Sequence, residues 1–234
     1  MSIKFIDCPP LLFKSYDKDL SGMVPNLEIN TKELTQNEMM HLAADCEFVM
    51  NEHTYMDAEF IAHCKRLKSI VFLGTGASSY IDIAAATNQG VRVRTVKGYG
   101  DRSVAEHAIA LMFSAGRRIV EMDNAIRKGQ WNTISSMEFR GKRLGVVGTG
   151  GIGSEVAKIG AALGMQVLAW NRSGVSKDLP CEEMELDKLI QRADILSLHL
   201  ALTDETEGIL NSERLQMLGS NAILVNTACY RFLN

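Results

Sequence analysis

The chain has 234 residues, enough for one large domain or two smaller ones. Hydrophobic residues make up 46% and charged residues 23%, ordinary globular values that argue against disordered, collagen-like and coiled-coil proteins. The net charge of −3 gives no electrostatic footprint for nucleic acid, and no apolar stretch is long enough to cross a membrane. We therefore expect a soluble protein whose partner is a small molecule.

The N-terminus and the cysteines bear on the compartment. Residues Met1 to Pro10 lack the long apolar core and the cleavage site of a secretory signal, so the expected location is the cytoplasm. The cysteines are odd in number, scattered and free of any CxxC pair, which argues against a disulfide framework and a metal site. We expect them to be buried thiols: Cys8, Cys46, Cys64, Cys181 and Cys229.

Short apolar runs rich in β-branched residues alternate with amphipathic stretches, a pattern typical of βα units around a mostly parallel sheet. The first expected strands are Ile3 to Ile6, Glu47 to Met50, Ser69 to Leu73 and Val91 to Val96. Helical patterns occur near Ala58 to Lys65 and Ile81 to Thr87. These elements predict a first α/β lobe.

A glycine-bearing connector runs from Lys97 to Asp101, and we place the lobe boundary there, between residues 1–98 and 99–234. Ser103 and Glu106 have the spacing of a capping box, which predicts the start of a long helix. The expected apolar face of that helix is Ala108, Leu111, Met112 and Ala115. Further strands are expected at Arg143 to Val147, Gln166 to Trp170, Ile195 to Leu200 and Ala222 to Asn226, with a helix ending near Leu163. This pattern favours a Rossmann-like second lobe.

The segment Gly148-Thr149-Gly150-Gly151-Ile152-Gly153 reads GxGxxG. The pattern alone is weak, but here it directly follows an apolar strand and opens a helix, the arrangement that rests a diphosphate on a helix N-terminus. Gly148 permits the tight turn, Gly150 lets the backbone approach the phosphates, and Gly153 allows close packing of helix on strand. A dinucleotide site is predicted, with a plain βα turn as the alternative.

The end of the next strand bears on the choice between NAD and NADP. An acidic side chain there would hold the ribose 2′-hydroxyl of NAD, but the sequence has Asn171, Arg172 and Ser173. An arginine flanked by hydrogen-bond donors suits a 2′-phosphate. NADP is therefore favoured over NAD, with a solvent-facing Arg172 that holds no ligand as the alternative.

Taken together, these motifs resemble the D-isomer-specific 2-hydroxyacid dehydrogenases, which include phosphoglycerate, glycerate, hydroxypyruvate, glyoxylate and D-lactate dehydrogenases. The resemblance runs from about Leu67 to Ala228. The motifs that carry it besides the glycine turn are Gly74-Thr75-Gly76 with Tyr80-Ile81-Asp82, Ser103-Val104-Ala105-Glu106-His107, Ile195 to His199 before Leu202-Thr203, and Leu224 to Ala228.

The resemblance implies a flavodoxin-like substrate lobe, an incomplete Rossmann lobe, and hydride transfer between NAD(P)H and a small 2-keto or 2-hydroxy acid. It implies that the turn carrying Thr75 and Gly76 holds the substrate carboxylate, with an ordinary glycine turn as the alternative. It also implies a homodimer through the long helix of the second lobe. The residues carried over to the cofactor site are Gly148, Gly150, Gly151, Ile152, Gly153, Asn171, Arg172, Ser173, His199, Thr206, Thr227 and Ala228.

The catalytic residues of the family have no counterpart in this sequence. Where the family has arginine and glycine, the chain has Cys229 and Tyr230, and Arg231 lies two residues late. The family's acid/base glutamate and histidine lie further along than Asn234, so we assign no catalytic residue and expect a C-terminally truncated chain. Without the charge stabiliser and the acid/base pair, turnover should be weak or absent. A non-catalytic nucleotide-binding protein and an inert fragment are the alternatives.

Overall fold

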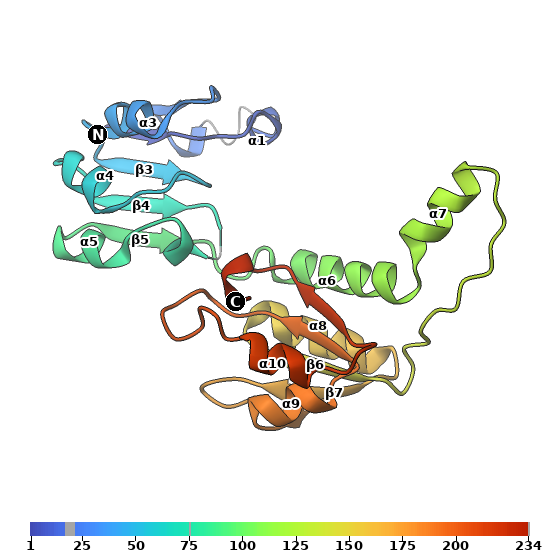
Figure 1. Cartoon of the computed structure of the whole chain (residues 1–234). Coiled ribbons are helices and arrows are strands. Elements are labelled where there is room, and N and C mark those ends of the chain that lie inside the picture. Colours follow the sequence, from blue (N-terminus) through green and yellow to red (C-terminus); the bar gives the residue numbers. More distant parts are fainter. Residues whose placement is uncertain (17–21, 75, 234) are drawn as a thin grey trace. The chain divides into compact units, whose positions relative to one another are not determined.

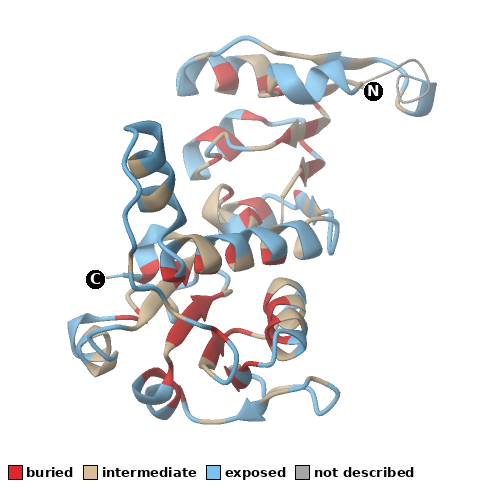
Figure 2. Cartoon of the chain, turned by 90° about the vertical axis from the view of Figure 1, so that its right-hand side faces the viewer, coloured by how far each residue is buried: buried red, intermediate tan, exposed pale blue. Residues whose placement is uncertain are grey.

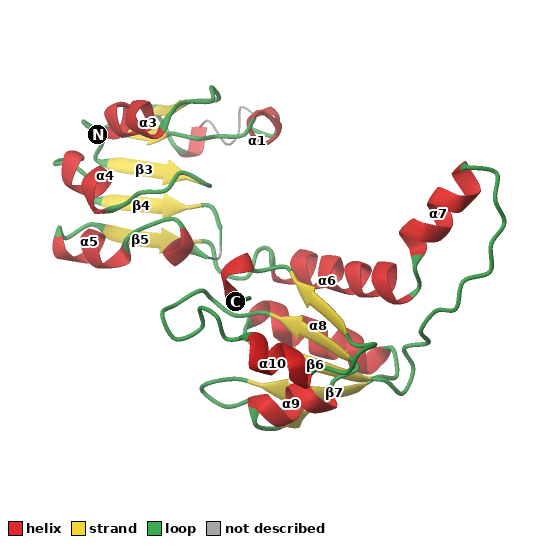
Figure 3. Cartoon of the chain, in the orientation of Figure 1, coloured by secondary structure: helices red, strands yellow, loops and turns green. Residues whose placement is uncertain are grey.

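The computed structural model describes residues 1–16, 22–74 and 76–233. They form two compact units, Met1–Lys97 and Gly98–Asn234, coloured along the chain in Figure 1. Within the described residues, each unit contains a five-stranded sheet in which every strand pair is parallel, with helices packed on it (Figure 3). The predicted α/β fold with two parallel sheets is confirmed.

The sheet of the first unit has the strand order β2-β1-β3-β4-β5, the flavodoxin-like order. Its strands are β1 (Ile3–Phe5), β2 (Leu27–Ile29), β3 (Phe48–Asn51), β4 (Ser69–Phe72) and β5 (Arg92–Thr95). Its helices include α1 (Pro10–Lys14), α3 (Gln36–Ala43), α4 (Ala58–His63) and α5 (Ile83–Asn88). Four of these strands match the prediction to within a residue or two, whereas β2 and α3 were not predicted.

Side chains cap helices α3, α4 and α5 of the first unit. The hydroxyl of Thr35 accepts from the amide of Glu38, whose carboxylate accepts from the Thr35 amide, a capping box that fixes the start of α3. Asp57 and Asp82 cap α4 and α5 in the simpler way, each accepting from an amide three residues on at 2.8 Å. These caps fix the residue at which each helix begins.

The sheet of the second unit has the order β10-β9-β6-β7-β8. Its strands are β6 (Arg143–Val147), β7 (Gln166–Trp170), β8 (Glu182–Glu183), β9 (Ile195–Leu198) and β10 (Ile223–Asn226). Its helices include α6 (Asp101–Gly116), α7 (Ile119–Arg127), α8 (Gly151–Ala162), α9 (Leu186–Arg192) and α10 (Ser212–Met217). The chain builds β7 and β8 on one side of β6, then crosses to add β9 and β10 on the other. The order of a doubly wound nucleotide-binding sheet results, with its switch point at the carboxyl ends of β6 and β9.

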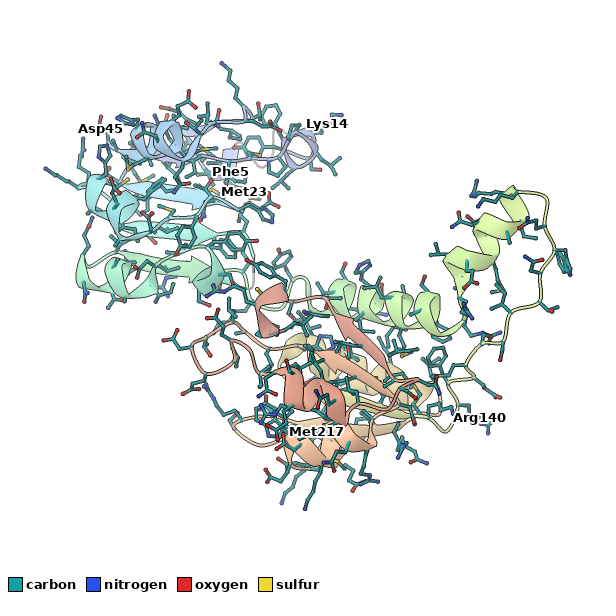
Figure 4. All side chains as sticks on the ribbon, in the orientation of Figure 1. Phe5, Lys14, Met23, Asp45, Arg140 and Met217 are labelled. Carbon is teal, nitrogen blue, oxygen red and sulfur yellow. The ribbon has the colours of Figure 1, made fainter. Side chains whose placement is uncertain are left out.

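Two apolar layers sandwich this sheet, and most of its central strands are buried (Figure 2). Helices α6 and α8 cover one face through residues such as Ala105, Met112 and Val156. Helices α9 and α10 belong to the other layer, which contains Leu189 and Phe232. Met217, labelled in Figure 4, packs at the edge of this second layer. No helix among the described residues is long and apolar enough to span a membrane.

The predicted start of the long helix was wrong, and its predicted apolar face was right only at Ala108 and Met112. Helix α6 begins at Asp101 with Gly100 as its N-cap, so Ser103 lies inside the helix and forms no cap. Glu106 instead pairs with Arg102 one turn back, at 3.2 Å. The buried face consists of Ala105, Ala108, Met112 and Gly116, whereas Leu111 and Ala115 are exposed. The helix starts three residues earlier than the cap pattern placed it, and the face that packs against α8 and β10 carries the small residues Ala105, Ala108 and Gly116.

The cysteine prediction holds in part. All five cysteines are free thiols, and Cys8, Cys46 and Cys64 are buried as expected. Cys181 and Cys229 are only half buried because both lie in segments at the margins of the second unit's apolar clusters. Among the described residues no cluster of three or more His, Cys, Asp or Glu could hold a metal ion.

An ion pair ties the amino ends of β6 and β9 together. Asp194 accepts from the Arg143 amide at 2.8 Å and from two guanidinium nitrogens at 3.0 and 2.8 Å. These hydrogen bonds lower the pKa of the Asp194 carboxyl below its usual value. The pair holds the starts of β6 and β9 side by side, and the carboxyl ends of these same strands form the switch point.

Replacing Asp194 with Asn should lower the free energy of unfolding by about 1–2 kcal/mol at pH 7, because charge-assisted hydrogen bonds are lost. Because the carboxyl pKa is lower in the folded state, the ion pair stabilises the fold fully at pH values above the unfolded-state pKa of about 4. This contribution disappears as the pH falls through the lowered folded-state pKa. The difference between wild type and D194N in urea unfolding should therefore shrink between pH 5 and pH 2. The control is D187N, which breaks the more exposed pair with Arg214. A D194N deficit that stays constant over this range would contradict the assignment.

Candidate functional site

The glycine turn between β6 and α8 is held by backbone contacts that exclude side chains. Gly148 has a φ of +92°, and a Cβ there would lie 2.5 Å from the carbonyl oxygen of His199. A Cβ on Gly153 would lie 1.8 Å from the carbonyl oxygen of Gly148. Contacts this short exclude any larger residue, so helix α8 starts in direct contact with the end of β6.

The tip of α8 is open at one glycine and covered at the next. No atom lies within 4 Å of where a Cβ on Gly150 would stand, whereas a Cβ on Gly151 would lie 1.7 Å from an Asp101 carboxylate oxygen. Asp101 comes from the first turn of α6 and places a negative charge beside the positive end of α8. Sequence reasoning missed this residue because the contact joins two helices far apart in the chain.

The residues that follow β7 take two different roles. The side-chain oxygen of Asn171 accepts from the Thr149 amide at 3.3 Å, and its amide group donates to Ser173 and to the Gly174 carbonyl. Asn171 thus ties the strand end to the glycine turn. Arg172 is exposed and forms an ion pair with Glu205, a residue of the loop after β9 that sequence reasoning did not select. Arg172 also lines a groove of about 780 Å³ beside the end of β7.

His199 lies beneath the glycine turn, at the end of β9. Its Nε2 is 2.8 Å from the hydroxyl of Ser197, and its buried Nδ1 has no hydrogen-bond partner among the described residues. Burial lowers the pKa of the imidazole to about 4, so the ring is neutral at pH 7. Residues i and i+2 of a strand share a face, so this pairing could have been read from Ser-Leu-His.

The remaining predicted cofactor residues lie on two loops at the same edge of the sheet. The hydroxyl of Thr206 donates to the Ala201 carbonyl at 2.7 Å and accepts from the Thr203 amide at 2.8 Å, so it closes the loop after β9. Thr227 and Ala228 follow β10, where the side-chain oxygen of Asn226 accepts from the Ala228 amide. Because parallel strands end at a common edge, these loops and the glycine turn share that edge.

The predicted substrate turn of the first unit follows β4. Gly74 rests on Phe72, since a Cβ there would lie 2.4 Å from the phenyl ring. Gly76 is the N-cap of a short 3₁₀ helix, Ala77–Ser79. Tyr80 then stacks on Phe72 with ring centroids 5.3 Å apart. Thr75 lies outside the described residues.

The segment after β10 is packed against the rest of the second unit. Phe232 is fully buried, and Leu233 forms a parallel bridge with Leu210. Arg231 forms two hydrogen bonds to Glu207, at 2.9 and 2.8 Å, which raise the pKa of its guanidinium. Cys229 is half buried, and its carbonyl accepts from the Asn226 side chain at 2.8 Å.

Comparison with known proteins shows which family has this fold and sequence. The family model for the D-isomer specific 2-hydroxyacid dehydrogenase NAD binding domain matches residues 109–229. A hydroxypyruvate reductase from Thermotoga maritima is 34% identical over 91% of this chain and 71% of its own length. The chain belongs to the D-isomer specific 2-hydroxyacid dehydrogenase family. Across the curated relatives compared, it spans between 34% and 71% of the relative's length.

Solved structures share this fold over the length of the chain. An acyclic imino acid reductase in complex with NADPH and D-Arg superposes with a TM-score of 0.91 at 27% identity, covering 100% of this chain and 76% of that one. D-lactate dehydrogenase from Aquifex aeolicus, complexed with NAD and lactic acid, gives 0.86 at 27% identity, covering 100% and 71%. The second unit of this 2-hydroxyacid dehydrogenase chain is thus an NAD-binding domain by family.

The residues present fit a pyridine nucleotide. The turn from Gly148 to Gly153 brings backbone close to an open helix tip, and at Gly150 nothing obstructs an approaching phosphate. The backbone carbonyl and Cβ of His199 lie against the same turn, and its buried Nδ1 has no hydrogen-bond partner among the described residues. Arg172 supplies a cation at the position where a doubly wound sheet recognises the adenosine ribose.

Proposed function

We propose that this chain is a 2-hydroxyacid dehydrogenase-type oxidoreductase that binds NADP in preference to NAD and acts weakly on a small 2-keto or 2-hydroxy acid. The observation that carries the proposal is the glycine turn, whose backbone contacts tolerate no side chain and leave the helix tip at Gly150 open. Arg172 supports the NADP preference, because the strand end itself supplies a cation between two hydrogen-bonding residues, Asn171 and Ser173.

When bound, the nucleotide supplies the hydride, and the protein's residues bind and orient the nucleotide and the substrate. The amides at the tip of α8 hold the diphosphate, the loops after β9 and β10 position the nicotinamide half, and the turn containing Thr75 and Gly76 binds the substrate carboxylate. Cys229 stands where the family has an arginine, so no cation at that position polarises the substrate carbonyl. Tight nucleotide binding with slow turnover is the expected behaviour.

The cofactor proposal is tested by fluorescence titration with NADPH and NADH on wild type and G150A. A methyl group at position 150 has no atom within 4 Å, so the variant should keep the wild-type melting temperature. The same methyl group stands where the diphosphate must approach, and NADPH affinity should fall by roughly tenfold or more. G219A serves as control, because it also adds a methyl group in open space but at the opposite edge of the sheet. Unchanged NADPH affinity in G150A, or no binding by wild type, would sink the proposal.

The weak activity is tested by C229R. A cation restored at this position should raise kcat/KM for glyoxylate or hydroxypyruvate reduction by about 10²-fold, the usual contribution of a preorganised charge stabiliser. C229S, which removes the thiol and adds no charge, should remain at the wild-type rate. NADPH titration and a thermal transition establish that both variants are folded. A folded, NADPH-binding C229R with the wild-type rate would refute the role given to this position.

We also propose that the chain forms a homodimer, with helix α7 as the interface in place of the long helix α6 that the resemblance implied. None of its residues is buried, and Ile119, Val120 and Ile126 are 48%, 63% and 52% exposed. The segment that follows carries Trp131, which is 87% exposed. Figure 1 shows α7 extending away from the sheet of its own unit. An apolar surface of this kind needs a partner, and a second copy of the chain supplies the same surface in return.

Light scattering coupled to size exclusion should give the mass of a dimer for wild type and of a monomer for V120K, because a buried lysine opposes association. Q216K adds the same charge on the exposed face of α10 and should remain dimeric. A monomeric wild type, or a dimeric V120K, would count against α7 as the interface.

A further inference from the structure

The ion pair between Arg172 and Glu205 joins two loops that lie on either side of the glycine turn. Arg172 follows β7, and Glu205 lies in the loop after β9, while the sheet places β6 between these two strands. The loop after β9 therefore reaches past the end of β6 to bring a carboxylate to the guanidinium. The two side chains are 71% and 68% exposed, so a ligand can reach both.

This pairing changes the chemistry at the end of β7. The sequence at Asn171-Arg172-Ser173 shows only a cation and hydrogen-bonding groups, which suits a 2′-phosphate. Glu205 adds the acidic group that a doubly wound sheet normally carries on the second strand itself, where a carboxylate accepts from the ribose 2′-hydroxyl. The ion pair thus combines Arg172, which suits the 2′-phosphate of NADP, with Glu205, which suits the 2′-hydroxyl of NAD.

We propose that Glu205 sets the selectivity between NADPH and NADH by competing with the 2′-phosphate for Arg172. This inference rests on the proposed nucleotide binding. An exposed ion pair is weak, so the phosphate displaces it readily. The displaced carboxylate stays on the same loop and repels a group that carries nearly two negative charges, whereas the uncharged 2′-hydroxyl of NADH meets no repulsion.

Neutralising Glu205 should favour NADPH. Coulomb repulsion between a carboxylate and a phosphate about 5 Å apart in water corresponds to roughly tenfold in affinity. The E205Q variant should therefore bind NADPH about tenfold more tightly than wild type. Its affinity for NADH should change by less than about threefold, because glutamine still accepts a hydrogen bond.

The experiment measures dissociation constants for NADPH and NADH by fluorescence titration of the full chain at low and high salt. E207Q is the matched control, since Glu207 lies on the same loop, is exposed, and pairs with Arg231 instead. R172Q and R172Q/E205Q complete a double-mutant cycle: once Arg172 is gone, removing Glu205 should still relieve repulsion but no longer free a cation. The gain in E205Q should shrink with salt.

Three results would overturn the inference. If both nucleotides bind wild type but E205Q leaves their ratio unchanged, Glu205 does not set selectivity and the proposed nucleotide binding stands. If E207Q gives the same gain, the effect comes from net charge and not from the pair with Arg172. If wild type binds neither nucleotide, the proposed function fails, and this inference fails with it.

Discussion

The contact between Gly153 and the carbonyl of Gly148 is the constraint on which the second unit's functional edge depends. It brings the first turn of α8 so close to the end of β6 that no side chain fits between them. The glycine turn also contacts His199, whose backbone oxygen occupies the space where a Cβ on Gly148 would lie. Strand β9 must therefore end beside β6, and the switch point of the sheet is fixed by packing around these glycines.

Electrostatics at this edge follow from the backbone arrangement. The tip of α8 carries the positive end of a helix dipole, and Asp101 from the neighbouring helix α6 lies against it. His199 remains neutral because burial opposes its protonation. A diphosphate at the tip would thus meet open amides at Gly150 and a like charge near Gly151. The balance between these two contributions sets how tightly an anion is held there.

Much of this architecture could be predicted from sequence because it is encoded locally. The strand from Gln166 to Trp170 and the strand from Arg143 to Val147 were predicted with their observed bounds, since a buried parallel strand is a continuous apolar run. The short strands β2 and β8 were missed, because Leu27-Glu28-Ile29 and Glu182-Glu183 contain no run of adjacent apolar residues like the Phe5-Ile6 pair that marks β1. The capping box predicted at Ser103 was wrong, because α6 already begins at Asp101 after the N-cap Gly100. A capping box does form at Thr35, at the start of α3, where none was predicted.

Contacts between distant segments escaped sequence reasoning. Glu205 reaches Arg172 only because the crossover from β8 to β9 places two loops at one edge, and Asp101 reaches Gly151 only because α6 and α8 start side by side. The predicted cofactor residues Asn171 and Thr206 proved to have their polar groups engaged within the protein. A motif identifies which segments meet at a site, whereas which side chain remains free for a ligand is decided by neighbours that the motif does not contain.

The two halves of the proposed chemistry depend on different parts of the chain. Nucleotide binding relies on main-chain amides and on glycines whose replacement creates a backbone clash, so it is insensitive to most side-chain changes elsewhere. In the proposed chemistry, carbonyl polarisation would rely on one side chain after β10, where the chain carries Cys229 in a segment that packs through Phe232. Because the segment is anchored by Phe232 and residue 229 is only half buried, we expect substitutions at this position to alter the local charge and to leave the fold intact. The proposed binding and the proposed turnover can therefore be tested separately.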